Sequence, residues 1–275
     1  MEGERFMASV NIKFDRFPGG VHKAASFSFD DGQVHDRRLV ATMNQYGLKG
    51  TFHLNSGKLG QGEEYLRPDE VAELFSGHEI SAHTVKHPFL EQSPDDQVVH
   101  EIMNDREALE ELAGYPVRGM SYPFGGYDDR ILSMLPALGI EYSRTTKSHG
   151  GFNLPSNPLQ WHPTCHQKDM IEAAERFLQS RPYGKRRELL LIWGHSFEFP
   201  RDGNWELMDR VGELLGGAEG VWHATMAEVV AYDRALSALR FSVDRRLAHN
   251  PSAIDVWFSA NGEPVKVGGG ETLKL

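Results

Sequence analysis

Short β-prone runs alternate with helix-like stretches through most of the 275 residues, and this rhythm restricts the chain to few folds. The β-prone runs lie at 24–30, 49–55, 78–82, 118–122, 140–145, 188–193 and 220–223. The helix-like stretches lie at 35–46, 69–76, 94–113, 127–138, 168–180, 204–215 and 225–237. Strands that alternate with helices predict parallel βαβ units. Seven such units favour a (β/α) barrel one unit short of the usual eight, and an open doubly wound sheet is the alternative.

Two segments interrupt this rhythm. Residues 146–167 form a long connection rich in Gly, Pro and Asn, and connections of that length are usually functional or disordered. After residue 241, short alternating runs flank Asn261-Gly262, a dipeptide typical of a two-residue hairpin turn. We therefore expect an N-terminal segment at 1–21, an α/β barrel at 22–237 and a small β-rich appendage packed on the barrel at 238–275.

Composition limits the classes of partner. The net charge of −10 disfavours a nucleic acid or an anionic membrane surface. No segment approaches the roughly 20 apolar residues of a membrane span, and the N-terminus has no hydrophobic run of signal-peptide length. As given, the sequence predicts a cytoplasmic protein, or an extracellular or periplasmic one if a leader has been trimmed. Cys165 is the single cysteine, so no disulfide forms within the chain, and no pattern specifies an oligomeric state.

Two adjacent carboxylates end the first barrel strand. The stretch ASFSFDDGQ places Asp30 and Asp31 side by side, and like charges in a partly dry site repel unless a cation or a proton intervenes. Further along, HEISAHTVKHP carries His83 and His87 four residues apart. On one helical turn such residues face the same way, so we expect both imidazoles to bind one ion. Two imidazoles and one carboxylate suit Zn²⁺ or a similar divalent ion.

The adjacency of the two aspartates then has a physical reason. Successive side chains on an extended strand point in opposite directions, and Gly32 permits a sharp turn that lets both carboxylates reach the mouth of the barrel. We expect one of the two aspartates to ligate the ion. The other would stay free to accept a proton from a water molecule that the ion activates.

Four motifs follow one another along the chain: SFDDG at 28–32, HTVKHP at 83–88, YPFGGYD at 122–128 and WGH at 193–195. Together they resemble the ordered motifs of the polysaccharide deacetylase family, the NodB-homology group of carbohydrate esterase family 4. The resemblance covers residues 22–235 and implies a distorted (β/α)7 barrel. It also implies metal-dependent removal of N- or O-linked acetyl groups from a carbohydrate polymer or oligomer. The expected cofactor is a divalent ion, zinc first, with cobalt or nickel as alternatives.

The resemblance also implies a role for single residues. Asp30 would be the general base, and His195 the general acid that protonates the leaving amine or alcohol. The backbone N–H of Phe124 would help to stabilise the oxyanion. The implied metal ligands are Asp31, His83 and His87.

The chain departs from the family pattern beside the base. The family usually carries an arginine two residues before the proline of YPFGG, and here that position is Ser121. Arg144, on the next strand, is the candidate replacement that would bring a guanidinium to Asp30. The alternative for Arg144 is an ordinary surface ion pair.

A second departure concerns the partner of the catalytic histidine. The family's aspartate-rich motif, which orients that histidine, has no match at 143–150. Glu198 and Asp169 are therefore candidates for the group that orients His195.

Aromatic residues are the candidate substrate contacts. Trp193 stands where the family usually has a leucine that lines the acetyl-methyl pocket, which predicts a preference for small acyl groups; a core tryptophan is the alternative. Tyr122 and Phe124 of YPFGG are further candidates. In the long connection, Trp161 is a candidate stacking surface for a sugar ring.

The long connection also repeats the histidine spacing. His162 and His166 lie four residues apart, as two ligands of a second metal ion would. Pro163 between them and the loop context argue against such a pair.

Three classes of function remain. A metal-dependent carbohydrate deacetylase accounts for the complete set of base, ligands and acid. A metal-dependent C–N hydrolase of a small amide or imide on the same barrel is the alternative, because the family's arginine and aspartate-rich motif are missing. A non-catalytic carbohydrate-binding protein is the third, although binding alone requires no such set.

Overall fold

The computed structural model describes residues 10–181 and 186–275. Its central sheet is parallel and runs in the order β6-β5-β4-β3-β2-β8-β7, with β9 beside the first residues of β2. The seven predicted strands are all present, as β2 (Lys23–Asp31), β3 (Gly50–Leu54), β4 (Glu79–Ala82), β5 (Gly119–Ser121), β6 (Tyr142–Arg144), β8 (Glu188–His195) and β9 (Val221–His223). The short β7 (Cys165–His166), inside the long connection, was not predicted.

The long connection joins the two edges of this curled sheet. The Trp161 N–H donates to the Ser143 carbonyl at 2.9 Å, and the Thr145 N–H donates to the Trp161 carbonyl at 3.0 Å. Three residues later, the Thr164 N–H donates to the Leu191 carbonyl of β8 at 2.8 Å. Because isolated bonds replace a full strand here, the curled sheet is a distorted barrel whose two edges are bridged only through this connection.

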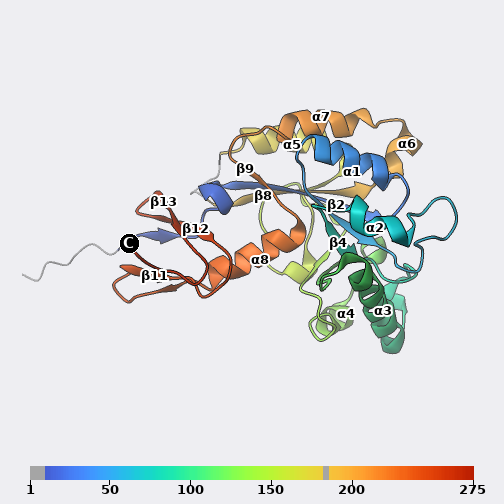
Figure 1. The fold of residues 1–275 in the computed structure, drawn as a ribbon, viewed down its shortest axis with the longest axis horizontal. Helices are drawn as coiled ribbons and strands as arrows, with labels where there is room; N and C mark the ends of the chain where they lie inside the picture. The colour runs from blue at the N-terminus through green and yellow to red at the C-terminus, as the bar shows by residue number, and fades with distance from the viewer. Residues whose placement is uncertain (1–9, 182–185) are drawn as a thin grey trace, which may run out of the picture.

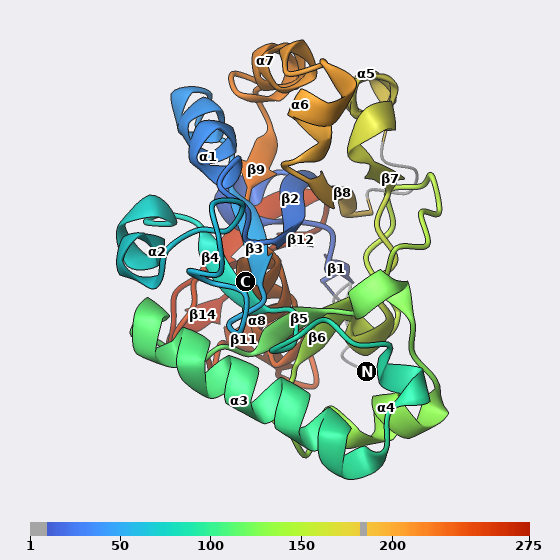
Figure 2. The same cartoon turned by 90° about the vertical axis from the view of Figure 1, so that its right-hand side faces the viewer.

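Helices surround the sheet in both views, with α1, α5, α6 and α7 on one side and α3 and α4 on the opposite side (Figures 1 and 2). The bounds are α1 (Asp36–Gln45), α2 (Pro68–Leu74), α3 (Asp95–Ala113), α4 (Asp129–Met134), α5 (Met170–Gln179), α6 (Glu198–Asp202), α7 (Glu206–Leu215) and α8 (Met226–Ser237). All correspond to predicted helices except α6, which is too short to show a helical repeat. None of the helices in the described ranges combines the length and the apolar character that crossing a bilayer requires.

The two faces of β2 have different surroundings, which positions the site. Phe27 and Phe29 pack in the apolar layer beneath α1 and α7, and the Phe29 ring centroid lies 6.1 Å from that of Phe52 on β3. The residues that alternate with them along the strand point to the other face, where Ser28 and Asp30 are buried among polar groups. The packing of one face of β2 in the apolar layer therefore fixes the position of the polar side chains on its other face.

The C-terminal appendage consists of β10 (Arg240–Phe241), β11 (Leu247–His249), β12 (Val256–Ala260), β13 (Glu263–Val267) and β14 (Thr272–Lys274). The predicted hairpin joins β12 and β13 through Asn261 and Gly262, both with positive φ (54° and 92°). The N-terminal β1 (Ile12–Lys13) pairs with β12, so β1 belongs to the same three-stranded sheet as β12 and β13. This sheet lies where β2 begins (Figure 1), at the end of the barrel opposite the carboxyl ends of the strands.

Helix α8 begins at a capping box. The Glu228 N–H donates to Thr225 Oγ1 at 3.2 Å, and the Thr225 N–H donates to the Glu228 carboxylate at 2.8 Å. Since the Thr225→Ala variant loses one of these bonds, we expect its free energy of unfolding to fall by about 1 kcal/mol, measured by urea denaturation. Exposed Ser237→Ala, in the last turn of the same helix, is the control and should change it by less than about 0.5 kcal/mol. Equal stabilities of the two variants would contradict this assignment.

Candidate active site

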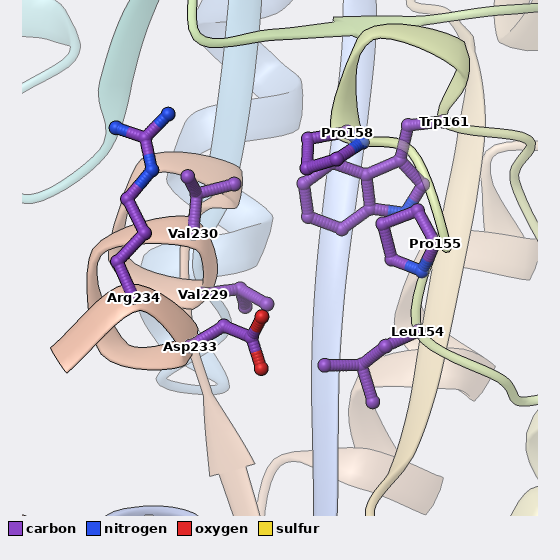
Figure 3. A pocket seen from close by; sticks show the side chains of 8 residues that line it. All are labelled: Leu154, Pro155, Pro158, Trp161, Val229, Val230, Asp233 and Arg234. Atoms are coloured by element: carbon purple, nitrogen blue, oxygen red, sulfur yellow. The ribbon is translucent and has the colours of Figure 1, made fainter. Parts of the chain in front are cut away.

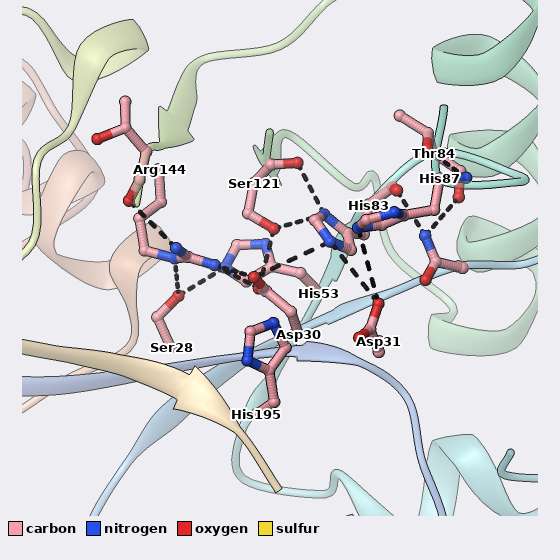
Figure 4. A network of polar contacts seen from close by, with 12 residues as sticks. Ser28, Asp30, Asp31, His53, His83, Thr84, His87, Ser121, Arg144 and His195 are labelled. Atoms are coloured by element: carbon pink, nitrogen blue, oxygen red, sulfur yellow. Dashed lines mark hydrogen bonds and ion pairs between the residues drawn. The ribbon is translucent and has the colours of Figure 1, made fainter. Parts of the chain in front are cut away.

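Polar side chains from five strand ends converge at the mouth of the barrel (Figure 4). They are Asp30 and Asp31 at the end of β2, His83 after β4, Ser121 at the end of β5, Arg144 at the end of β6 and His195 at the end of β8. The carboxyl ends of parallel barrel strands are where barrel enzymes carry their active sites.

Three predicted ligands lie within reach of one ion. The Nε2 atoms of His83 and His87 are each 3.9 Å from Asp31 Oδ1, and the three ligand atoms lie within 4.8 Å of one another. Asp31 Oδ1 is buried without a hydrogen-bond partner, and its nearest cation, Lys58 Nζ, is 3.8 Å away. Burial lowers the pKa of His83 and brings the pKa of His87 to about 4, so both imidazoles are in the neutral form that binds metals. These residues therefore fit a divalent ion.

The two imidazoles do not reach this position on a helical turn, which corrects the sequence-based prediction. Residues 83–89 follow β4 as an irregular loop, in which Thr84 and His87 have positive φ (69° and 62°). The Asn55 amide donates to the carbonyls of His83 and Thr84 at 2.6 and 3.0 Å. The His87 N–H donates to Thr84 Oγ1 at 3.0 Å. The side-chain bonds of Asn55 and Thr84 thus replace a helical ladder in bringing the histidines together.

Backbone strain is concentrated around this site. Asp31 has φ 82° and Phe124 has φ 57°, so with Thr84 and His87 the site holds four of the six non-glycine residues with positive φ in the described ranges. Each such residue costs of order 1–3 kcal/mol and persists only where its surroundings impose it. At Asp31 this conformation, followed by the predicted turn at Gly32 (φ 68°), re-aims the strand end so that both carboxylates face the mouth.

His83 is oriented by its other ring nitrogen. Its Nδ1–H donates to the Ser121 carbonyl at 2.9 Å, which leaves the Nε2 lone pair free for an ion. The backbone N–H of His83 donates to Asp105 Oδ2 at 2.9 Å. Asp105 also accepts a bond from the Ser56 N–H at 2.8 Å, and burial raises the pKa of Asp105 to about 7.

Arg144 reaches Asp30, as the sequence predicted. Its Nη2 donates to both carboxylate oxygens of Asp30, and its Nε donates to Ser28 Oγ at 2.8 Å. Arg144 is fully buried, so the alternative of a surface ion pair is wrong. Ser121 Oγ, at the position of the family's arginine, donates to Asp30 Oδ1 at 2.9 Å. Burial alone would raise the pKa of Asp30, but Arg144 and then His83 outweigh burial and hold that pKa well below its usual range.

His195 lies against Glu198. Its Nδ1 is 3.4 Å from Glu198 Oε1, although the geometry does not amount to a hydrogen bond and Nδ1 has no other partner. Burial opposes a charge on His195, but Glu198, Asp30 and Asp31 outweigh burial and raise the pKa of His195. The other candidate partner, Asp169, is exposed, and in the described part of the chain no hydrogen bond or ion pair joins it to His195.

Two predicted substrate residues line the mouth. Trp193 is partly exposed, and its ring centroid lies 4.8 Å from Arg144 Cζ, so it covers the buried ion pair rather than packing in the core. Phe124 is 54% exposed. Its ring stacks on that of Phe89, with 3.9 Å between the ring centroids, and meets the His87 ring edge-on, with 4.4 Å between the centroids. The Phe124 N–H belongs to the first turn of the short helix Pro123–Gly125, where N–H groups have no acceptor within the helix.

The side chains of Tyr122 and Trp161 do not contact substrate as predicted, because each is only 1% exposed. The Tyr122 hydroxyl donates to the Leu159 carbonyl at 2.7 Å. The Trp161 ring packs edge-on against that of Tyr142, with 5.8 Å between the ring centroids. Trp161 also lines a cavity beside α8 (Figure 3). That cavity, about 40 Å³, has room for a few water molecules but not for a sugar ring. The pairing of Trp161 with β6 explains its orientation away from the mouth.

Sequence reasoning missed two residues of the site, Ser28 and His53, and one buried acid outside its hydrogen-bond network. Ser28 Oγ lies 2.8 Å from Nε2 of the buried His53, and His53 is in register with Asp30 on the neighbouring strand. The spacing of two between Ser28 and Asp30 was a usable signal, since alternate residues share a strand face. Asp36 is 1% exposed with neither carboxylate oxygen hydrogen-bonded, and burial raises the pKa of Asp36 to about 8. Asp36 begins a helix, where acidic residues are common, so its sequence position did not indicate that it would be buried.

Comparison with known proteins relates this site to one family. Residues 19–143 match the family model described as polysaccharide deacetylase. A peptidoglycan-N-acetylglucosamine deacetylase of Bacillus cereus is 32% identical over 113 residues, covering 40% of this chain and 39% of that protein. Chitin deacetylase 1 of Cryptococcus neoformans is 25% identical over 137 residues, covering 49% of this chain and 28% of that protein. The chain thus spans well under half the length of these relatives.

Solved structures share the fold over more of the chain. A candidate polysaccharide deacetylase from Mycobacterium smegmatis superposes with a TM-score of 0.62 at 18% identity, covering 84% of this chain and 95% of that one. A family 4 carbohydrate esterase from Streptomyces lividans has a TM-score of 0.51 at 15% identity, covering 74% of this chain and 93% of that one. The expected distorted (β/α)7 barrel is confirmed. Residues 19–143 of the chain are therefore similar to the polysaccharide deacetylase family.

Proposed function

We propose that this protein removes acetyl groups from an N- or O-acetylated carbohydrate, with a divalent ion, zinc first, held by Asp31, His83 and His87. One observation carries the proposal. Asp30, which Arg144 keeps ionised, lies with its Oδ2 3.9 Å from His83 Nε2, directly beside the fitted ligand set. A general base must be unprotonated and must lie close to the water that it deprotonates, and the position of Asp30 beside the ligand set is what makes it the candidate.

The residues divide the chemistry as follows. When bound, the ion would polarise the acyl carbonyl and lower the pKa of a water molecule. Arg144 and Ser121 hold the Asp30 carboxylate in place to accept the proton of the attacking water. The Phe124 N–H would donate to the oxygen that becomes negative. His195, whose pKa is raised, then gives a proton to the leaving amine or alcohol.

The relatives suggest which substrates to test first. The names of the Bacillus and Cryptococcus proteins specify peptidoglycan N-acetylglucosamine and chitin. Both contain N-acetylglucosamine units, so chitooligosaccharides and peptidoglycan fragments are the first candidates, followed by acetylxylan. The partly exposed Trp193 supports a site that admits acetyl in preference to larger acyl groups.

Removal and return of metal tests the proposal. We expect the zinc-loaded protein to release acetate from at least one of these substrates, chelation to lower the rate at least about 100-fold, and added zinc to restore it. Enzymatic acetate determination measures the rate. Asp31→Asn, treated in the same way, should not recover. Chelation-resistant acetate release would contradict the metal dependence. Turnover of small amides or imides without acetate release would instead favour the C–N hydrolase, and binding without any turnover would favour a carbohydrate-binding protein.

A further inference from the structure

We propose that His166, His195 and Glu198 form a second divalent-cation site, and that an ion bound there prevents His195 from acting as the acid. The binding part of this inference is independent of the proposed function, and the inhibition part rests on it. The four-residue histidine spacings in the sequence did not predict this cluster. Its members come from β7, β8 and α6 and meet only in the folded chain.

The three side chains already have the spacing of a ligand set. One ligand atom from each lies within 4.8 Å of the other two. His166 Nε2 is 3.0 Å from Glu198 Oε2, and His195 Nδ1 is 3.4 Å from Glu198 Oε1. Their side chains are only 13–21% exposed. Two imidazoles and a carboxylate are the donor set that suits Zn²⁺, Co²⁺ or Ni²⁺.

Two further features resemble a metal site more than an ordinary ion pair. His195 Nδ1 is buried without a hydrogen-bond partner, although the carboxylate is close. Gln167, 3% exposed, donates from Nε2 to Glu198 Oε2 and to the His195 carbonyl, both at 3.1 Å. Such bonds to a ligating carboxylate orient the ligands of metal sites.

The surroundings allow access but predict modest affinity. His166, Trp193 and Arg201 line one open hollow, through which an ion can enter. Arg201 Nη2 lies 3.7 Å from Glu198 Oε1 and competes with a cation for that carboxylate. The Arg201 side chain is 55% exposed, so it can move aside. We therefore expect this site to fill after the one at Asp31, His83 and His87.

Occupation has a consequence for catalysis. An ion on Nδ1 takes the lone pair that a proton occupies in the imidazolium form, so His195 stays neutral and has no additional proton to give. Excess metal would then inhibit the enzyme that lower metal activates. His166 contributes to the second site and has no role in the proposed reaction.

Metal stoichiometry tests the site without any activity assay. In equilibrium dialysis against rising zinc, the wild-type chain should bind about two ions, one tightly and one more weakly. Asp31→Asn should lose the tight ion, His166→Ala the weak one, and the double variant both. His162→Ala is the matched control, since His162 lies in the same connection but its Nδ1 is 2.6 Å from Thr145 Oγ1; it should bind as the wild type does. Identical isotherms for His166→Ala and the wild type would overturn the proposal.

Inhibition is then measured on the same proteins. At low zinc, His166→Ala should release acetate at the wild-type rate, and the zinc concentration that halves the rate should rise at least about tenfold. Unchanged inhibition in His166→Ala would refute the inhibitory role even if the second ion is bound. Two ions without acetate release on any substrate would refute the proposed function and leave the second site standing. One ion in the wild type would refute the second site alone.

Discussion

Asp30→Asn is expected to lower kcat for acetate release by about 1,000-fold, within the range that removal of a general base produces, while the zinc content stays unchanged. Asparagine has nearly the shape of aspartate and can still accept the bond from Ser121 Oγ, but its amide cannot take a proton from water. Asp31 keeps its own carboxylate for the ion. Rate measurements with metal analysis on the same sample separate loss of the base from loss of the metal.

Asp36→Asn is the matched control for this variant. Asp36 is also a buried carboxyl, and because burial raises its pKa to about 8, a neutral amide replaces a group that is already largely neutral at pH 7. We expect its kcat to change by less than about tenfold. If Asp30→Asn retained more than about a tenth of wild-type kcat, Asp30 would not be the base.

Arg144→Ala is expected to lower both stability and activity. The substitution leaves the Asp30 carboxylate buried without its counter-ion, which costs about 3–5 kcal/mol of unfolding free energy for a broken buried pair. Because Arg144 holds the pKa of Asp30 down, its removal should raise that pKa. The acid limb of the pH–rate profile should therefore move to higher pH, with a lower kcat.

A double-mutant cycle isolates the charge pair. Adding Asp30→Asn to Arg144→Ala removes the uncompensated charge, so the double variant should be less destabilised than the sum of the single variants, by about 1–3 kcal/mol. Urea denaturation of the four proteins measures this coupling. Additive free energies together with an unmoved acid limb would show that Arg144 serves only as packing. Arg144→Lys should be intermediate, since an ammonium retains the charge but cannot contact both Asp30 and Ser28 in the same way.

The outcome at Arg144 shows how far sequence reasoning reached. The absence of the family arginine at Ser121 pointed to a substitute on the next strand, and residues that end adjacent parallel strands meet at one edge of the sheet. The same reasoning failed for Trp161 and Tyr122, because an aromatic residue near a motif has no periodicity that tells which way its ring points. Burial is a property of all surrounding elements together.

By itself, the sequence determined the alternation of strands and helices and the strand ends that carry the site, while the barrel was favoured over an open doubly wound sheet. It also predicted which residues would act as ligands and base, since such predictions depend on residue type and on position after a strand. Only the tertiary structure decided how His83 and His87 converge through a strained loop, and that Ser28 and His53 support the pair of Arg144 and Asp30. It alone brought His166 to Glu198. Such contacts join residues far apart in the chain, and side-chain packing and hydrogen bonding select them among alternatives that local spacing leaves equal.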